Sequence, residues 1–164
     1  ADYEFTTLKP NLGVVDIDYN NAFVIADIPG IIEGASEGRG LGLEFLKHIE
    51  RTRVCLFCLD SARDESLIEQ FETLKKELEN YSEKISKNNF AIAITRIDAL
   101  DAELLDSKLS EFTAQIGIPY KNGSGENFFY ENDSQNLRVV MPISSSAHIN
   151  IEKLKFALFR ILKG

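Results

Sequence analysis

The sequence predicts an α/β fold with a mostly parallel sheet and helices on both of its faces. Short apolar runs typical of buried strands alternate with amphipathic segments after an initial hairpin, which is the pattern of strand-helix-strand units. The 164 residues are 44% hydrophobic and 27% charged, a composition that fits one globular domain with a substantial core. We therefore expect residues 1–164 to form a single α/β domain.

A hairpin and a glycine-rich segment come first. Residues 13–18 (GVVDID) and 22–27 (AFVIAD) predict two strands, joined at 19–21, where two asparagines suit the positive φ of a tight turn. Residues 27–42 (DIPGIIEGASEGRGLG) contain five glycines and lack strand or helix periodicity. Such a segment is either a linker or a loop that meets a ligand. A helix is predicted over 43–52, and this flanking structure favours the loop.

The remaining chain continues the alternation. Apolar residues spaced by three and four positions, such as Leu67, Phe71, Leu74 and Leu78, predict an amphipathic helix. The predicted strands are 54–60, 89–95 and 137–144, and the predicted helices are 66–85, 102–117 (closed by Gly117) and 150–163. Residues 120–136 are polar and irregular, so we expect a surface insertion.

Composition excludes several classes of function. The formal net charge of −8 opposes general binding to phosphate backbones, so any nucleic-acid contact has to be local. Cys55 and Cys58 form a C-x-x-C within a predicted strand, where their side chains point to opposite faces and cannot share a metal. Neither a signal peptide nor an apolar run approaching 18 residues is present, which predicts a cytoplasmic protein without a membrane span.

Ligands of such sheets bind beyond the carboxyl ends of the strands. This rule selects Asp27 to Gly30, Asp60-Ser61, Thr95 to Asp98 and Ser144 to Ser146. Asp27 is suited to hold Mg²⁺ through water, and Gly30 to offer an unshielded backbone N–H to a phosphate. Asp98 can accept two parallel hydrogen bonds, which matches the N1–H and 2-amino donors of guanine.

The order of these pieces resembles the guanine-nucleotide-binding domain of the Obg family of GTPases along nearly the whole chain. The strongest matches are FTTLKPNLG at 5–13 and DIPGIIEGASEGRGLGLEFLKHIERTR at 27–53. The resemblance implies a Ras-like P-loop NTPase fold with one antiparallel hairpin strand, and a cytoplasmic GTP/GDP switch linked to the large ribosomal subunit or its RNA. It also implies that Thr7 and Asp27 hold Mg²⁺, Asp27 through water, and that Gly30 contacts the γ-phosphate.

The nucleotide-binding residues implied by the resemblance lie in two switch loops and two guanine-recognition loops. They are Phe5, Thr6, Thr7, Leu8 and Lys9; Asp27, Ile28, Pro29 and Gly30; Thr95, Arg96, Ile97 and Asp98; and Ser144, Ser145 and Ser146. The glycines of the second switch loop would let its backbone change path between the GTP and GDP states.

The sequence departs from the family pattern in several places. It contains no G-x-x-x-x-G-K-[ST], which in relatives precedes the position of Ala1 together with the central strand of the sheet, so we expect a partial domain. The N-K-x-D motif appears as Thr95-Arg96-Ile97-Asp98, which predicts weaker guanine binding, and Ser145 replaces an alanine. Ile31 takes the place of a Ras-type glutamine, which predicts slow hydrolysis and leaves the catalytic residue unassigned.

Other interpretations compete with the GTPase. A degenerate domain that binds partners without GTP turnover is favoured by the missing phosphate loop and opposed by the near-intact switch loops. The three serines at 144–146 equally suit a helix cap. A phospho-acceptor domain using Asp27 or Asp60 lacks the lysine that it requires after a later strand, and the glycines of 38–42 lie too far past their strand for a dinucleotide fingerprint.

Overall fold

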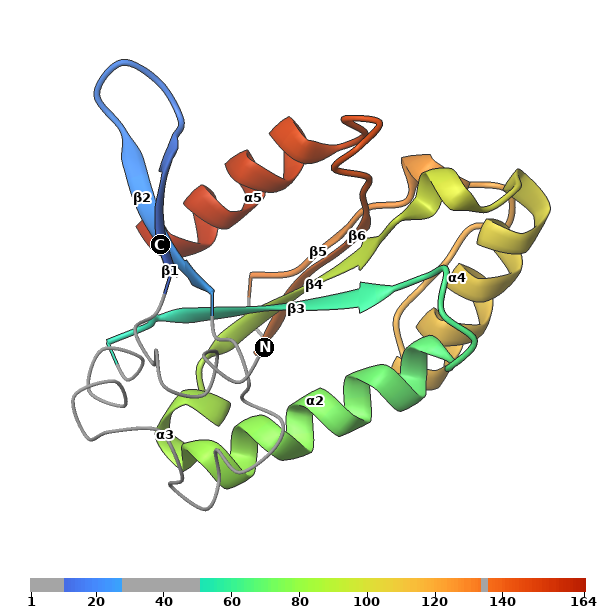
Figure 1. Cartoon of the computed structure of the whole chain (residues 1–164), viewed down its shortest axis with the longest axis horizontal. Helices are drawn as coiled ribbons and strands as arrows, with labels where there is room; N and C mark the ends of the chain where they lie inside the picture. Colours follow the sequence, from blue (N-terminus) through green and yellow to red (C-terminus); the bar gives the residue numbers. More distant parts are fainter. Residues whose placement is uncertain (1–10, 28–50, 134–135) are drawn as a thin grey trace, which may run out of the picture. The chain divides into compact units, whose positions relative to one another are not determined.

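The computed structural model of the chain describes residues 11–27, 51–133 and 136–164 (Figure 1). The chain divides into two compact units, one of residues 1–53 with 74–88 and the other of residues 54–73 with 89–164. The predicted switch-loop residues 5–9 and 28–31 lie outside the described residues, as does most of the helix predicted over 43–52. Residues 51–53 are described and are not helical.

The hairpin of the first unit confirms the sequence prediction. Strands β1 (Asn11–Asp16) and β2 (Ala22–Asp27) pair in antiparallel register, and β1 begins two residues earlier than expected. The expected positive φ at the two asparagines of the turn is wrong, because the described residues with positive φ do not include them. A wider loop over 17–21 makes it unnecessary: the Asp18 carboxylate accepts a hydrogen bond from the Asn20 N–H at 3.0 Å.

The second unit contains a four-stranded sheet with the strand order β3-β4-β6-β5. Three strands run parallel, and β5 pairs antiparallel with β6 at one edge. The strands are β3 (Val54–Asp60), β4 (Asn89–Thr95), β5 (Tyr130–Glu131) and β6 (Leu137–Pro142). Asp60 lies beside Thr95 in the register of β3 and β4, so the residues that follow these strands emerge at the same edge of the sheet.

The predicted α/β class with a mostly parallel sheet is confirmed. In the first unit, β1 and β2 form an antiparallel pair, and the second unit holds the mostly parallel sheet. The parallel arrangement of β3, β4 and β6 is confirmed.

The helices follow the predicted order with one break. The helix expected over 66–85 is divided into α2 (Leu67–Tyr81) and α3 (Glu83–Ser86), because the side chain of Ser82 caps α3 by accepting the Ile85 N–H. Helices α4 (Ala102–Ile116) and α5 (Ile151–Lys163) are confirmed. Gly117 ends α4 with φ of 78°, a left-handed conformation that favours glycine.

Helices cover both faces of the four-stranded sheet, as expected. Figure 1 shows α5 on one face and α4, with the first turns of α2, on the other. The second face is fixed by an aromatic cluster of Phe57, Phe71, Phe90 and Phe112, whose ring centroids lie 5.4 to 6.2 Å apart. Residues 91–94 of β4 are fully buried between the two layers. This packing holds the carboxyl ends of β3 and β4 in fixed positions.

The segment 120–136 is more ordered than its polar composition predicts. It contains the 3-10 turn η3 (Gly125–Asn127) and strand β5, and Phe128 is only 6% exposed. The Tyr120 hydroxyl donates a hydrogen bond to the Asp106 carboxylate, which also accepts the Gly123 N–H at 2.7 Å. These contacts fasten the first part of the segment to α4, and η3 and β5 are regular elements within an otherwise irregular stretch.

Within the described part of the chain, no helix is both long and apolar enough to cross a bilayer.

Candidate functional site

Asp98, Ser144 and Ser146 meet where β4 and β6 end. Asp98 lies in the 3-10 turn η2 (Ile97–Ala99) that follows β4, and the two serines lie beyond β6. The Ser144 hydroxyl donates to Oδ1 of Asp98 at 2.7 Å, and the Ser146 hydroxyl donates to Oδ2 at 3.1 Å. Ser144 is fully buried, whereas Asp98 is exposed. The cluster therefore presents an oriented carboxylate to solvent.

Backbone hydrogen bonds shape the loop that carries the serines. The Ile149 N–H donates to the Ser144 carbonyl at 2.8 Å, and the Ser144 N–H donates to the Ile149 carbonyl at 3.1 Å. The Ser144 hydroxyl also accepts the Ala147 N–H at 3.0 Å. Helix α5 has Asn150 as its N-cap and no side-chain cap bond, so the helix-cap interpretation of the serines is wrong.

The hydrogen bonds from the serines lower the pKa of Asp98. The largest cause is the Ser144 hydroxyl, partial desolvation opposes it, and the Ser146 hydroxyl and the positive charge of Arg96 add to the lowering. A carboxylate with a lowered pKa stays ionised and accepts hydrogen bonds throughout the neutral range. Its two oxygens fit paired N–H donors such as those on the guanine edge.

Arg96 and Asp60 form an ion pair beside this cluster. Arg96 adopts a left-handed conformation with φ of 60° and turns the chain from β4 into η2. Its Nη1 lies 3.0 Å from Oδ2 of Asp60, at the end of β3. Partial burial by itself raises the pKa of Asp60, but the Ala62 N–H and the charges of Arg96 and Arg63 outweigh it and hold the pKa below its ordinary value.

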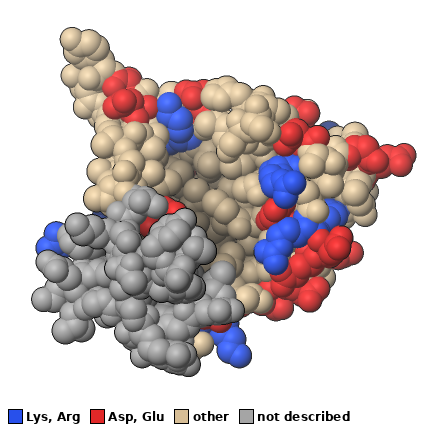
Figure 2. Space-filling view, in the orientation of Figure 1, with Lys and Arg blue, Asp and Glu red and all other residues tan. Residues whose placement is uncertain are grey.

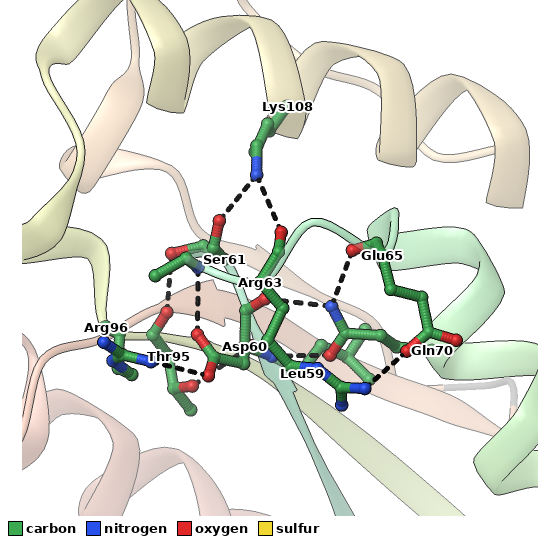
Figure 3. Close-up of polar contacts among 10 residues, drawn as sticks. Leu59, Asp60, Ser61, Arg63, Glu65, Gln70, Thr95, Arg96 and Lys108 are labelled. Carbon is green, nitrogen blue, oxygen red and sulfur yellow. Dashed lines mark hydrogen bonds and ion pairs between the residues drawn. The ribbon is translucent and has the colours of Figure 1, made fainter.

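Further hydrogen bonds fix the chain around Asp60 (Figure 3). The Gln70 side-chain carbonyl accepts the Asp60 N–H at 2.8 Å, and the Gln70 amide donates to the carbonyls of Asp60 and Glu65 at 2.9 and 3.0 Å. Lys108 of α4 donates to the Ser61 carbonyl at 2.6 Å. Sequence reasoning missed these supports. The available signal was Gln70, a polar residue within the apolar stripe of α2 that is only 4% exposed.

Thr95 holds β3 and β4 together at the same edge. Its hydroxyl donates to the Leu59 carbonyl at 3.2 Å, and its carbonyl accepts the Ser61 hydroxyl at 2.7 Å. Ile97 is buried, and Ser145 is exposed in the loop after β6. Of the two predicted guanine-recognition loops, the structure thus joins Asp98 to Ser144 and Ser146 by hydrogen bonds. Thr95, Arg96 and Ile97 lie on the first of these loops and Ser145 on the second.

The predicted phosphate and magnesium residues are described only in part. Asp27 ends β2, in the first unit, and its side chain is exposed. Thr7, Gly30, Ile31 and the other switch residues named from the sequence lie outside the described residues. Within the described ranges, no group of three or more His, Cys, Asp or Glu side chains could hold a metal ion.

Charges of both signs surround the candidate site. Figure 2, in the orientation of Figure 1, shows Lys or Arg and Asp or Glu side chains interspersed on the side where β3 and β4 end. Arg96 with Asp60 and Arg63 with Glu65 are ion pairs of this region. This mixed face lacks the single-sign patch that general phosphate-backbone binding requires, in keeping with the net charge of −8.

Comparison with solved structures identifies the fold. The chain aligns over 99% of its length with a crystal structure of translation elongation factor SelB from Methanococcus maripaludis in complex with the GTP analogue GppNHp, at 14% identity and a TM-score of 0.56 over 30% of that chain. A bacterial selenocysteine-specific elongation factor EF-Sec matches with a TM-score of 0.52, at 17% identity over 99% of this chain and 23% of that chain. The fold is therefore that of the Ras-like P-loop NTPases.

The sequence comparisons define the family. A family model described as 50S ribosome-binding GTPase matches residues 1–96. The chain is 49% identical over 166 aligned positions to GTPase Obg of Nautilia profundicola and 43% identical over 177 to GTPase Obg of Sulfurimonas denitrificans, with 99% of this chain covered in both. It spans 45% and 48% of those two proteins. The chain belongs to the family of 50S ribosome-binding GTPases, and the Obg resemblance inferred from its motifs is confirmed.

Proposed function

We propose that this chain is the guanine-nucleotide-binding part of a GTP-hydrolysing switch of the Obg type. The observation that carries the proposal is the cluster of Asp98, Ser144 and Ser146, in which both carboxylate oxygens are oriented at the carboxyl ends of β4 and β6. That edge is where parallel α/β sheets bind ligands. Family membership and the fold support the same assignment.

In this proposal, Asp98 selects guanine through its N1–H and 2-amino group. The Ser146 hydroxyl leaves Oδ2 of Asp98 when the base binds, while the buried Ser144 hydroxyl stays on Oδ1. The backbone N–H groups of Ser145 and Ser146 would donate to the guanine O6. Arg96, 62% exposed at its side chain, supplies a planar cation for the ring face.

The phosphate end rests on the predicted switch residues. Gly30 contacts the γ-phosphate, and Thr7 and Asp27 hold Mg²⁺, Asp27 through water. The donor set fits, because a carboxylate and a hydroxyl are the hard oxygen ligands that Mg²⁺ prefers, and the Asp27 carboxylate is exposed at a strand end. When bound, the ion neutralises charge on the phosphates during attack by water. Asp27 would orient its hydration shell, and Thr7 would add a direct oxygen.

The partner implied by the proposal is the large ribosomal subunit or its RNA. The matching family is described as 50S ribosome-binding, and two relatives of this chain are named GTPase Obg. With a net charge of −8, the chain would meet RNA through a local contact rather than a basic face.

Calorimetric titration tests the proposal. The chain is titrated with Mg²⁺-GDP and Mg²⁺-GTP, with the adenine nucleotides for comparison, and guanine-selective binding is expected. Asp98→Asn should abolish guanine selectivity and favour xanthine, whose 2-oxo group accepts a hydrogen bond from the new amide. Asp133→Asn removes the same charge from an exposed residue outside the cluster and should change nothing. Equal or absent binding of all nucleotides by a folded sample would overturn the assignment.

A binding module without GTP turnover is the second candidate. It is favoured by Thr95 and Arg96 in the recognition motif. Phosphate release from GTP separates the two candidates: guanine-selective binding with no release above the Mg²⁺-GTP blank indicates the binding module, and release that depends on protein concentration indicates the switch.

A further inference from the structure

We propose that Asp60 is a positioning residue for nucleotide binding, because it holds the Arg96 guanidinium as a fixed plane on which the guanine ring stacks. The proposal rests on the proposed function, which supplies the guanine. Asp60 lies at the end of β3, one strand away from the predicted recognition motif, and no family motif named from the sequence includes it. The ion pair between Arg96 Nη1 and Asp60 Oδ2, at 3.0 Å, is the contact that joins the two.

The Asp60 carboxylate is fixed before any ligand arrives. Its Oδ1 accepts the Ala62 N–H at 2.9 Å, which directs Oδ2 toward Arg96. The Gln70 side chain accepts a hydrogen bond from the Asp60 N–H at 2.8 Å and donates one to the Asp60 carbonyl at 2.9 Å. The next residue, Ser61, is hydrogen-bonded to the Lys108 side chain and to the Thr95 carbonyl. A side chain anchored by so many contacts serves as a support rather than as a mobile surface charge (Figure 3).

Arg96 needs such a support more than a lysine would. A lysine ammonium is a point charge that attracts a ring from many directions, whereas a guanidinium stacks only when its plane is parallel to the ring. The left-handed backbone of Arg96 fixes the direction in which its side chain leaves the chain, and the ion pair with Asp60 fixes the position of Nη1. The side chain is 62% exposed, so the pair leaves much of the guanidinium surface accessible. Arg96 stands where the family motif has lysine, and in this proposal its guanidinium is oriented by Asp60.

The Asp60→Asn variant isolates this contact. Its side-chain oxygen can still accept the Ala62 N–H, but the new amide group cannot accept from Arg96. We expect GDP affinity to fall by about three- to tenfold, as for the loss of an oriented cation beneath a ring. Affinity for inosine diphosphate, which lacks the 2-amino group, should fall by the same factor, because stacking does not depend on that group. The GDP-to-IDP ratio would then be unchanged.

The matched control is Glu131→Gln. It removes one negative charge and breaks the Arg160–Glu131 pair, which is also 3.0 Å long and similarly exposed but joins β5 and α5. We expect no change in nucleotide affinity. Far-ultraviolet circular dichroism and the urea midpoint verify that both variants are folded.

A double-mutant cycle provides the test that a purely structural role would not pass. If Asp60 acts through Arg96, Asp60→Asn should have no further effect on GDP affinity in an Arg96→Ala background. Equal effects of Asp60→Asn in both backgrounds, or no effect in the parent chain, would overturn the inference while leaving guanine binding intact. Failure of the parent chain to bind GDP at all would instead refute the proposed function, and this inference with it.

Discussion

The Gln70 side chain should be a measurable source of stability for the loop after β3. It makes hydrogen bonds of 2.8, 2.9 and 3.0 Å to three backbone groups, and it is only 4% exposed. In Gln70→Leu, the Asp60 N–H and the carbonyls of Asp60 and Glu65 lose their partner while the volume is nearly kept. Three hydrogen bonds at about 1 kcal/mol each give about 3 kcal/mol. Burial of the more apolar leucine returns about 1 kcal/mol, which leaves a loss of about 2 kcal/mol.

Urea unfolding followed by circular dichroism measures this loss. With a slope of about 2 kcal/mol per molar urea, the midpoint should fall by about 1 M. Gln115→Leu, the same substitution at an exposed position of α4, is the matched control and should stay within about 0.5 kcal/mol of the parent. If Gln70→Leu and Gln115→Leu have equally small effects, the buried amide does not hold the loop, and the argument for a rigid Asp60 loses its main support.

Three other measurements probe separate parts of the chain. Gly117→Ala should lower the free energy of unfolding in urea by about 1 kcal/mol, because φ is 78°. Gly13→Ala should lower it less, because φ is not positive there and an added Cβ would lie 3.6 Å from its nearest neighbour. The Asp98 pKa, followed by carboxyl NMR, should lie below 3.8 and rise in Ser144→Ala. Because the folded pKa is the lower one, this contribution to stability is present above pH 3.8 and is lost as pH falls through the folded pKa. Burial raises the pKa of Cys55 to about 11, so its alkylation at pH 8 should be slow until the chain unfolds.

Much of the fold could be predicted because local patterns agree with the tertiary structure. The strands β2, β3 and β4 match their predicted bounds, since each is a short apolar run bounded by polar residues. Gly117 marked the end of α4 for a local reason, its left-handed conformation. The break at Ser82 was not predicted, because the apolar spacing continues through it. Only the capping hydrogen bond from the Ile85 N–H to the Ser82 side chain divides the helix.

The candidate site was predictable at the level of loops but not of contacts. The strand-end rule selected Asp60, Asp98 and Ser144 to Ser146, and the structure places the last two groups within hydrogen-bond distance. The ion pair from Asp60 to Arg96 could not be predicted, because it depends on the register of β3 against β4 and on the left-handed turn at Arg96. The order within 120–136 was missed for a similar reason, since β5 is defined by its pairing with β6.

The base-recognition end of the proposed site is assembled within one unit, from contacts that need no nucleotide. Ser144 holds one oxygen of Asp98, Asp60 holds Arg96, and each of these supports is itself hydrogen-bonded. Guanine would therefore have to displace only the Ser146 hydroxyl, exchanging one hydrogen bond to Oδ2 for another of about equal strength. These side chains therefore lose little conformational entropy when the base binds. Selectivity would then depend on the second N–H that guanine offers to Asp98, because adenine has no pair of donors to match the two oxygens.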